Sequence, residues 1–384
     1  MYALCHGVIH TGHATLHDHA VVVDGERIHA ILPLADLPAD LSRIDLQGRH
    51  LAPGFIDLQL NGCGGVMFND APTAATLEIM HQANLKSGTT TFLPTLITSP
   101  DADMKQAIAA TRDFMLAHPH RVLGVHLEGP YTNVARKGIH PANQIRQPDD
   151  SMVDYLCSQH EWIAKITLAP EQNQAAHIRR LTEAGILVSA GHTAATYDQA
   201  IAGFDAGIRF ATHLYNAMTP TSNGREPGVV GAIYDRDDVA CGIIVDGFHV
   251  HPAIVRQAHR LLGGRLCLVT DATAPAGAPQ GFESFDFCGS TVYFRDGQCV
   301  DKNGTLGGSA LTMIEGVANL VKLVGLPLDE ALRMASLYPA RALDCEQALG
   351  TIAVGKVANL VVFDDQFQIS TTIDHGQPFT MTTK

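Results

Sequence analysis

Long apolar runs are missing from this sequence. No stretch approaches the roughly 18 consecutive apolar residues of a membrane-spanning helix, so we expect no membrane association. The first residues also lack a basic segment followed by an apolar core, the pattern of a secretory signal. We therefore expect a cytoplasmic protein.

Paired cysteines and basic residues are also scarce. The eight cysteines are scattered and include no Cys-x-x-Cys pair, which argues against a zinc knuckle or a redox motif. Lys and Arg number 26 against 39 Asp and Glu, for a formal net charge of −13. Such a charge argues against nucleic acid as a partner. It does not exclude a small anionic substrate, which needs only a local pocket of donors.

Eight short apolar runs are present instead. The first covers residues 55–60, and the others lie within 89–98, 121–130, 162–171, 185–193, 209–218, 239–247 and 265–273. Segments between them, such as 76–88 and 253–264, have apolar residues three and four apart, and several end in Gly, as amphipathic helices do. Eight strand–helix units predict an α/β fold, a (β/α)₈ TIM-like barrel. The alternative is a doubly wound open sheet, but no Gly-x-Gly-x-x-Gly follows the first strand.

The two ends of the chain have a different pattern from the centre. Residues 1–50 have the pattern of short strands and turns, and 350–365 have that of hairpin strands with Gly turns. Terminal segments that flank a barrel can pair with each other. We therefore predict one small β-sandwich built from 1–50 and 349–384, and a catalytic barrel over 51–348.

The first apolar run carries polar residues where a buried strand would not favour them. Asp57, Gln59 and Asn61 share one face by the two-residue period of a strand. Their presence raises the question of what lies on that face.

Other polar residues follow the later runs. In a barrel of this kind the chemistry gathers at the carboxyl ends of the strands. Glu128, His192, His213 and Asp271 all stand at such ends. Each alone is more often a cap or a structural hydrogen-bonding residue. Together, one Glu and two His match the ligand set of a catalytic zinc or similar ion, and Asp271 would then stand beside the attacking water as general base and acid. His126 lies deeper, and we interpret it as a core residue or a support for the ligands.

Longer motifs carry a family resemblance. PGFID at the first strand, the ordered strand-end ligands and the exit segment YPARALDCEQALGTIAVGKVANLVVFD resemble the amidohydrolase superfamily of metal-dependent barrels. Within it, HLEGPY, KGIHPAN, SAGHT, THLYNAM, GREPG, DGFHV and VTDATAPAG are similar to deacetylases of amino-sugar phosphates. The resemblance implies hydrolysis of N-acetyl-D-glucosamine 6-phosphate to D-glucosamine 6-phosphate and acetate. The alternative is a related acetamido sugar such as N-acetylgalactosamine 6-phosphate.

The same resemblance accounts for the amides of the first strand. Most amidohydrolases have His-x-His where this chain has Gln59 and Asn61, and neutral amides are poor ligands for a zinc-like ion. The resemblance therefore implies one divalent ion per chain, held by Glu128, His192 and His213. Zinc is the first choice, with iron, manganese and cobalt left open. Gln59 would hydrogen-bond the water at that ion.

The resemblance also implies the residues that meet the substrate. His140 would lie over the acetamido carbonyl, beside the catalytic Asp271. The expected substrate-binding residues are Ile139, His140, Asn216, Ala217, Arg225, His249, Leu306, Gly307 and Gly308. Loop 219–228 would serve as a lid or reach a neighbouring subunit in a homodimer or higher homo-oligomer. Two simpler interpretations are a solvated Arg225 and a barrel that has become a scaffold without activity; the complete ligand set argues against the second.

Overall fold

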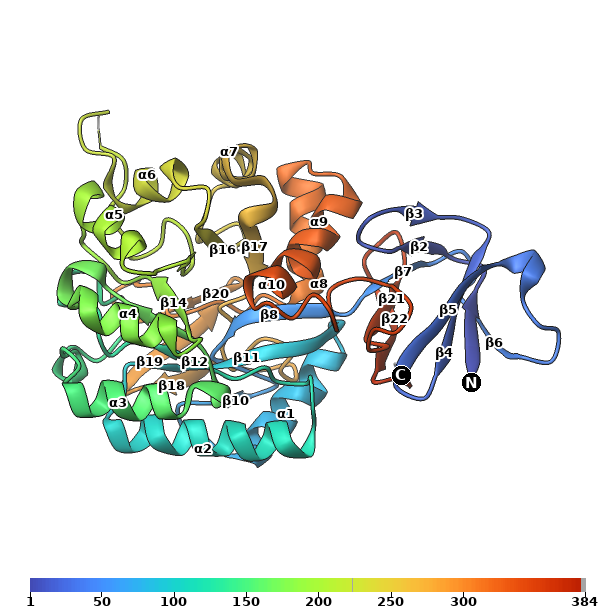
Figure 1. Ribbon diagram of the computed structural model, residues 1–384, viewed down its shortest axis with the longest axis horizontal. Helices are drawn as coiled ribbons and strands as arrows, with labels where there is room; N and C mark the ends of the chain where they lie inside the picture. Colours follow the sequence, from blue (N-terminus) through green and yellow to red (C-terminus); the bar gives the residue numbers. More distant parts are fainter. Residues whose placement is uncertain (223, 381–384) are drawn as a thin grey trace.

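An eight-stranded parallel sheet forms the centre of the protein. The computed structural model describes residues 1–222 and 224–380. The sheet curls into a nearly closed barrel surrounded by helices (Figure 1). Its strands are β8 (Phe55–Leu60), β11 (Thr89–Ile97), β12 (Val125–Glu128), β13 (Ile163–Leu168), β14 (Leu187–Ala190), β15 (Phe210–Ala211), β16 (Ala240–Ile244) and β17 (Leu266–Val269). Each lies inside one of the eight predicted runs, so the predicted α/β barrel is confirmed.

Asp57 closes the barrel between its first and last strands. Its side chain accepts hydrogen bonds from the Thr270 N–H, at 3.2 Å, and from the Thr270 hydroxyl. One residue further along, the Asp271 N–H donates to the Gln59 carbonyl at 3.0 Å. Burial raises the pKa of Asp57 to about 6. The carboxylate in the apolar first run thus fixes β8 to the segment that carries Asp271.

Helices cover the outside of the barrel. They are α1 (Ala74–Leu85), α2 (Asp101–Ala117), α3 (Asp150–Ser158), α4 (Ala175–Glu183), α5 (Tyr197–Asp205), α6 (Gly228–Asp235), α7 (Pro252–Leu262), α8 (Met313–Asn319), α9 (Leu328–Ala335) and α10 (Leu337–Ala342). α7 illustrates the sequence signals: Pro252 occupies its first turn, and Gly263 ends it with φ of 53°, a conformation that favours glycine. No helix of the described residues is long and apolar enough to span a bilayer.

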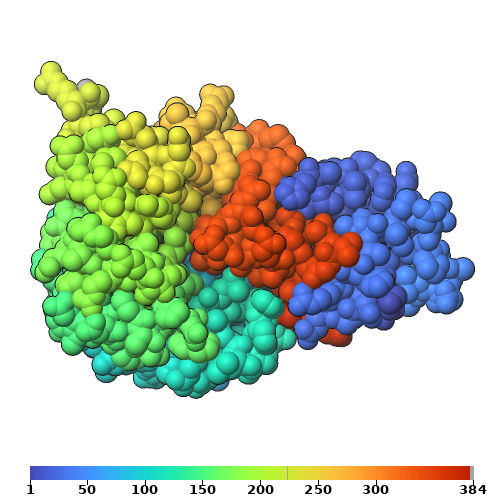
Figure 2. Space-filling view, in the orientation of Figure 1, coloured from blue at the N-terminus to red at the C-terminus, as the bar shows by residue number. Residues whose placement is uncertain are grey.

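Both ends of the chain form a second unit beside the barrel, as Figures 1 and 2 show. One sheet has the order β5-β4-β1-β6, from β1 (Tyr2–Cys5), β4 (His19–Asp24), β5 (Arg27–Pro33) and β6 (Ser42–Asp45). The other has the order β23-β22-β21-β7-β2-β3, from β2 (Val8–His10), β3 (Thr15–Leu16), β7 (His50–Pro53), β21 (Leu360–Phe363), β22 (Ile369–Asp374) and β23 (Gln377–Thr380). Leu4, Val21, Leu51 and Val362 belong to one apolar cluster between these sheets. The predicted sandwich of both termini is therefore present.

The limits of the units stay predictions. β7 pairs with β21 as far as Pro53, so the sandwich sheet continues past residue 50. The last four residues of the expected segment 349–384, numbers 381–384, lie outside the described residues.

A small antiparallel sheet follows β17 and was not predicted. It consists of β18 (Ser284–Phe287), β19 (Ser290–Arg295) and β20 (Gln298–Val300). Phe285, Phe287 and Val292 pack with Met67 and Ile97 from the loops and strands of the first two barrel units. This packing places the insert over the carboxyl end of β11.

Candidate active site

The four predicted strand-end residues converge at one end of the barrel. Glu128 ends β12, His192 and His213 follow β14 and β15, and Asp271 follows β17. All four are buried. His192, His213 and Asp271 adopt positive φ values of 48°, 35° and 50°, a conformation that is uncommon for residues with a Cβ and that clusters at functional sites. The backbone thus turns sharply at each of these three residues.

Three potential ligand atoms lie within hydrogen-bonding distance of one another. Glu128 Oε1 is 3.2 Å from His192 Nε2 and 3.0 Å from His213 Nε2, and the two Nε2 atoms are 3.1 Å apart. His192 Nδ1 faces the Arg136 carbonyl at 2.9 Å and must donate to it, so a neutral His192 has its lone pair on Nε2. That lone pair points at a carboxylate oxygen, an arrangement that a cation would stabilise.

The geometry of this group fits a divalent ion. With bonds of about 2.0–2.2 Å, the ligand atoms of a tetrahedral zinc site are about 3.3 Å apart. Glu128, His140 and His192 also offer ligand atoms within 4.8 Å of one another. His213 Nε2 lies 3.0 Å from Glu128 Oε1 and 3.1 Å from His192 Nε2, whereas His140 Nδ1 is engaged with Thr98 Oγ1 at 2.8 Å. Glu128, His192 and His213 are therefore the better candidate ligand set.

The three ligand candidates also affect one another's ionisation. Burial would raise the pKa of Glu128, but the contacts of its carboxylate with His192 and His213 hold that pKa well below its usual value. Burial pulls the pKa of His213 down, and the hydrogen bond and charge of Glu128 outweigh it, so that the pKa is raised. The site therefore keeps its carboxylate charged, as ligation requires.

Two amides hold Asp271 beside this group. Gln59 Nε2 donates to Asp271 Oδ1 and to Glu128 Oε1, both at 3.0 Å, and Asn61 Nδ2 donates to Asp271 Oδ1 at 2.7 Å. Burial and then the charge of Glu128 raise the pKa of Asp271. In the described part of the chain, the buried oxygens Gln59 Oε1 and Asn61 Oδ1 have no hydrogen-bond partner. The polar face of the first strand therefore points at the two carboxylates.

Next to the candidate ligands, His126 contacts a series of hydroxyl groups. His126 Nδ1 lies 3.1 Å from Thr95 Oγ1, and Nε2 lies 2.7 Å from Thr167 Oγ1. Further hydrogen bonds join the hydroxyl of Thr167 to that of Thr212 at 2.7 Å, and the hydroxyl of Thr212 to that of Ser189 at 2.6 Å. Both nitrogens of His126 are therefore engaged, and the residue supports the strands that carry the candidate ligands.

A cavity of about 330 Å³ is lined in part by the candidate ligands, and its volume is suited to a small molecule. Many of the predicted site residues line it: Glu128, Ile139, His140, His192, Asn216, Ala217, His213, His249, Asp271, Leu306 and Gly308. Gln59, Gly307 and Arg225 are not among its lining residues. Gln59 is covered by the carboxylates that it binds, and Arg225 is exposed on loop 219–228.

Two histidines of the cavity are oriented by neighbouring side chains. His249 Nδ1 lies 2.6 Å from Asp246 Oδ2, and Asp246 Oδ1 accepts from the N–H groups of Phe248 and His249, each at 2.9 Å. Burial opposes the charge of Asp246, but its bond to His249 lowers the pKa of that carboxyl. On the other side, burial lowers the pKa of His140 well below its usual value, so this imidazole is neutral.

Sequence reasoning missed several lining residues. Phe287 and Thr305 come from the unpredicted insert and the segment after it. Arg136 lies in the loop after β12, where a lone Arg is ordinarily solvated. None of these three residues had a local sequence signal that could have identified it.

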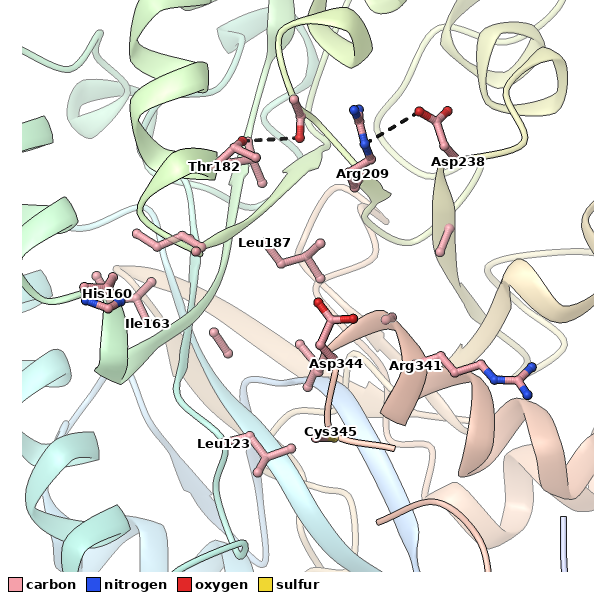
Figure 3. A pocket seen from close by; sticks show the side chains of 18 of the residues that line it. Leu123, His160, Ile163, Thr182, Leu187, Arg209, Asp238, Arg341, Asp344 and Cys345 are labelled. Carbon is pink, nitrogen blue, oxygen red and sulfur yellow. Dashed lines mark hydrogen bonds and ion pairs between the residues drawn. The ribbon is translucent and has the colours of Figure 1, made fainter. Parts of the chain in front are cut away.

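A larger depression, of about 880 Å³, lies at the other end of the barrel (Figure 3). Its lining includes Ile163 and Leu187, the first residues of β13 and β14. Arg209 faces Asp238 across 3.6 Å at its rim, as the figure shows, and Arg341 pairs with Glu346 at 3.0 Å. Because these charged groups pair with one another, we assign this depression no role in the chemistry.

Known families match almost the whole chain. The profile of the amidohydrolase family matches residues 50–381, and that of the NagA composite domain matches residues 1–51. The chain is 48% identical over 376 residues to the N-acetylglucosamine-6-phosphate deacetylase of Haemophilus influenzae, covering 98% of each protein. It is 39% identical to the N-acetylgalactosamine-6-phosphate deacetylase of a Shewanella species, over 87% of this chain and 84% of that relative.

Solved structures agree with the fold over its full length. The crystal structure of N-acetylglucosamine-6-phosphate deacetylase from Pasteurella multocida superposes with a TM-score of 0.97 at 51% identity, covering 99% of this chain and 100% of the other. A mutant of the Mycobacterium smegmatis enzyme in complex with N-acetyl-D-glucosamine-6-phosphate gives a TM-score of 0.92 at 31% identity, covering 99% of both chains.

Proposed function

This chain belongs to the amidohydrolase family, and from that premise we propose that it hydrolyses N-acetyl-D-glucosamine 6-phosphate to D-glucosamine 6-phosphate and acetate. One observation carries the proposal: a convergent Glu128, His192 and His213 set lies beside a buried Asp271 of raised pKa, under a cavity of small-molecule size. Relatives that act on this substrate support it at high identity and coverage.

We propose one divalent ion per chain, zinc first, with iron, manganese or cobalt as alternatives. Glu128, His192 and His213 would hold it. When bound, such an ion polarises the acetyl carbonyl and lowers the pKa of the attacking water. The amide nitrogens of Gln59 and Asn61 donate to Asp271, so on the side of Asp271 they present N–H groups and no lone pairs for a second ion.

Asp271 moves the proton in this proposal. Its carboxylate takes a proton from the water as the water attacks the acetyl carbon. Its raised pKa lets it keep that proton until the amine leaves, and it then protonates the departing nitrogen. Gln59 and Asn61 hold Oδ1, which leaves Oδ2 of Asp271 for the proton.

His140 would stabilise the developing oxyanion. Its Nδ1 lies 2.8 Å from Thr98 Oγ1, and when Thr98 donates to Nδ1 the ring has its proton on Nε2. An Nε2–H can donate to the acetyl oxygen as negative charge gathers there. His140 is neutral, so it contributes a hydrogen bond rather than a full charge.

The remaining predicted contacts concern the sugar phosphate. We propose that Ile139, Asn216, Ala217, His249, Leu306, Gly307 and Gly308 contact the sugar, and that Arg225 reaches a phosphate from loop 219–228. Because Arg225 is exposed and outside its own cavity, this contact requires a homodimer or a higher oligomer in which the loop meets a neighbouring subunit. We further propose a cytoplasmic enzyme of amino-sugar catabolism with the units 1–50, 51–348 and 349–384.

An acetate-release assay on protein loaded with one metal equivalent tests this function. The expected result is hydrolysis of N-acetylglucosamine 6-phosphate with a higher kcat/KM than for N-acetylgalactosamine 6-phosphate. The second epimer is a specific alternative because a relative of that name is 39% identical to the chain. A reversed preference would favour that alternative, and no acetate from either sugar would contradict both.

A further inference from the structure

Arg136 is the one Lys or Arg among the described residues that line the catalytic cavity. We propose that Arg136 binds the phosphate group of the substrate from within its own subunit and thereby selects phosphorylated sugars. This inference rests on the proposed function, because it names a further residue for the same substrate.

The backbone of Arg136 is fixed to the catalytic centre. Residues Val134–Arg136 form a 3₁₀ turn that begins at Asn133, whose side chain accepts from the Ala135 N–H at 2.9 Å. The Arg136 N–H donates to the Asn133 carbonyl at 2.9 Å, and the Asn133 N–H donates to the His192 carbonyl at 2.9 Å. The Arg136 carbonyl accepts from His192 Nδ1 at 2.9 Å. The turn therefore keeps a constant position relative to the metal-ligand candidate.

The side chain of Arg136, by contrast, has no partner in the described part of the chain. Its guanidinium makes no hydrogen bond or ion pair there, although the residue is half-buried. Arg146, further along the same loop, pairs with Asp101 and donates to the Ser99 carbonyl at 3.1 Å. Arg136 thus lines the cavity with five N–H groups that have no partner in the described residues, and their planar fork matches a phosphate.

Electrostatics favours this assignment. The cavity contains the carboxylates of Glu128 and Asp271, and the whole chain carries a net charge of −13. A phosphate dianion entering it meets repulsion unless a cation stands close. Asn216 and His249 offer hydrogen bonds, and Arg225 lies outside the cavity of its own chain. Arg136 is therefore the local positive charge that this subunit supplies.

Three variants test the assignment. Arg136→Ala removes the guanidinium and keeps the carbonyl that His192 uses, while Arg136→Lys keeps a charge without the fork. Arg179→Ala is the matched control, because it removes the same charge from an exposed position on α4 outside the cavity. Thermal unfolding and metal content of all variants establish that each is folded and loaded.

Charge-assisted hydrogen bonds of this kind correspond to about a 10- to 100-fold change in an equilibrium constant. We expect Arg136→Ala to lower kcat/KM on N-acetylglucosamine 6-phosphate by that factor, mainly through KM, with little change on unphosphorylated N-acetylglucosamine. Arg136→Lys should retain more activity than Arg136→Ala, and Arg179→Ala should match the wild type. Equal losses on both sugars, or no loss on the phosphorylated sugar, would overturn the inference.

A binding measurement separates this inference from the proposed function. Titration calorimetry with glucosamine 6-phosphate and with glucosamine requires no turnover. We expect Arg136→Ala to weaken binding of the phosphorylated amine selectively. Equal affinities of the wild type and Arg136→Ala for glucosamine 6-phosphate would overturn the inference even where acetate is released. Absence of acetate release by the wild type would contradict only the proposed function.

Discussion

Gln59 joins Asp271 to Glu128 through a single amide nitrogen. Gln59 Nε2 lies 3.0 Å from Asp271 Oδ1 and 3.0 Å from Glu128 Oε1, so each of its two hydrogens serves one carboxylate. A metal ion between these carboxylates would face N–H groups rather than lone pairs. The amide therefore links the proposed base to a proposed ligand and disfavours a second ion at the same place.

The first prediction concerns metal stoichiometry. We expect about one tightly bound divalent ion per chain, because one convergent Glu–His–His set is present beside the two amides. A chelator should abolish acetate release, and one equivalent of metal should restore it. Elemental analysis of the purified and restored protein provides the measurement. Two ions per active chain, both needed for turnover, would contradict this expectation.

The second prediction concerns Asp271. Asp271→Asn preserves the shape and can still accept from Gln59 and Asn61 through its oxygen, but it cannot take the proton of the water. We expect kcat to fall about 10²- to 10⁴-fold, while metal content and binding of the substrate change little. Single-turnover rates with calorimetric binding check both halves of this expectation. Near wild-type turnover by the metal-loaded variant would remove Asp271 from the proposed role.

The third prediction concerns Thr98, a positioning residue that acts through His140. Thr98→Val removes the hydroxyl 2.8 Å from His140 Nδ1 and frees the ring to place its proton on either nitrogen. We expect kcat to fall on the order of 10-fold with a smaller change in KM, since the oxyanion forms only after binding. Thr98→Ser retains the hydroxyl and should restore kcat. A KM effect alone, or no rescue by Ser, would indicate a packing role.

The fourth prediction concerns Arg225. If loop 219–228 completes the cavity of a neighbouring subunit, mixing Arg225→Ala chains with Asp271→Asn chains should restore part of the activity. One of the two sites in each mixed dimer would then contain both intact residues. Activity of isolated mixed dimers, compared with either parent variant, is the measurement. Mixed dimers as inactive as their parents would confine the action of Arg225 to its own chain.

The barrel could be predicted because its strands are continuous apolar runs that end in polar residues. The same periodicity placed Asp57, Gln59 and Asn61 on one face. It could not distinguish Asp57, which bonds Thr270 and closes the barrel, from Gln59 and Asn61, which bond Asp271. Those roles depend on contacts between residues more than 200 positions apart in the chain.

Other features had no local signal. The sheet β18–β20 consists of strands three to six residues long whose apolar side chains pack on Met67 and Ile97. Arg136 differs from a solvated loop arginine only through the fold, which sets its turn against His192. The candidate ligands could be selected from the sequence because a Glu and two His at strand ends are expensive to bury without a purpose.

The last prediction concerns stability and pH at the contact between the sandwich and the barrel. Asp374, at the end of β22, lies 3.0 Å from both His81 Nε2 of α1 and a guanidinium nitrogen of Arg121, and 2.7 Å from His375 Nδ1. Burial alone would raise the pKa of Asp374, but hydrogen bonds to His375 and His81 and the charges of His81 and Arg121 lower it well below its usual value. Folding lowers the pKa of Asp374. The stabilising contribution of its carboxylate is therefore complete above about pH 4, the pKa of an Asp in the unfolded chain, and declines as the pH falls further.

Asp374→Asn should therefore lower the free energy of unfolding at pH 7 by about 3 kcal/mol, near the lower limit for a broken buried ion pair, because the Arg121 side chain is 24% exposed. The difference between wild type and variant should shrink as the pH falls from 4 to 2, since protonation then removes the same charge from the wild type. Urea unfolding at several pH values measures both.

Asp365→Asn is the control. Asp365 also pairs with a histidine, His50 at 3.0 Å, but its side chain is 90% exposed, so we expect the free energy of unfolding to change by less than about 1 kcal/mol. A difference between wild type and Asp374→Asn that stays constant down to pH 2 would show that packing, and not the carboxylate charge, holds this contact.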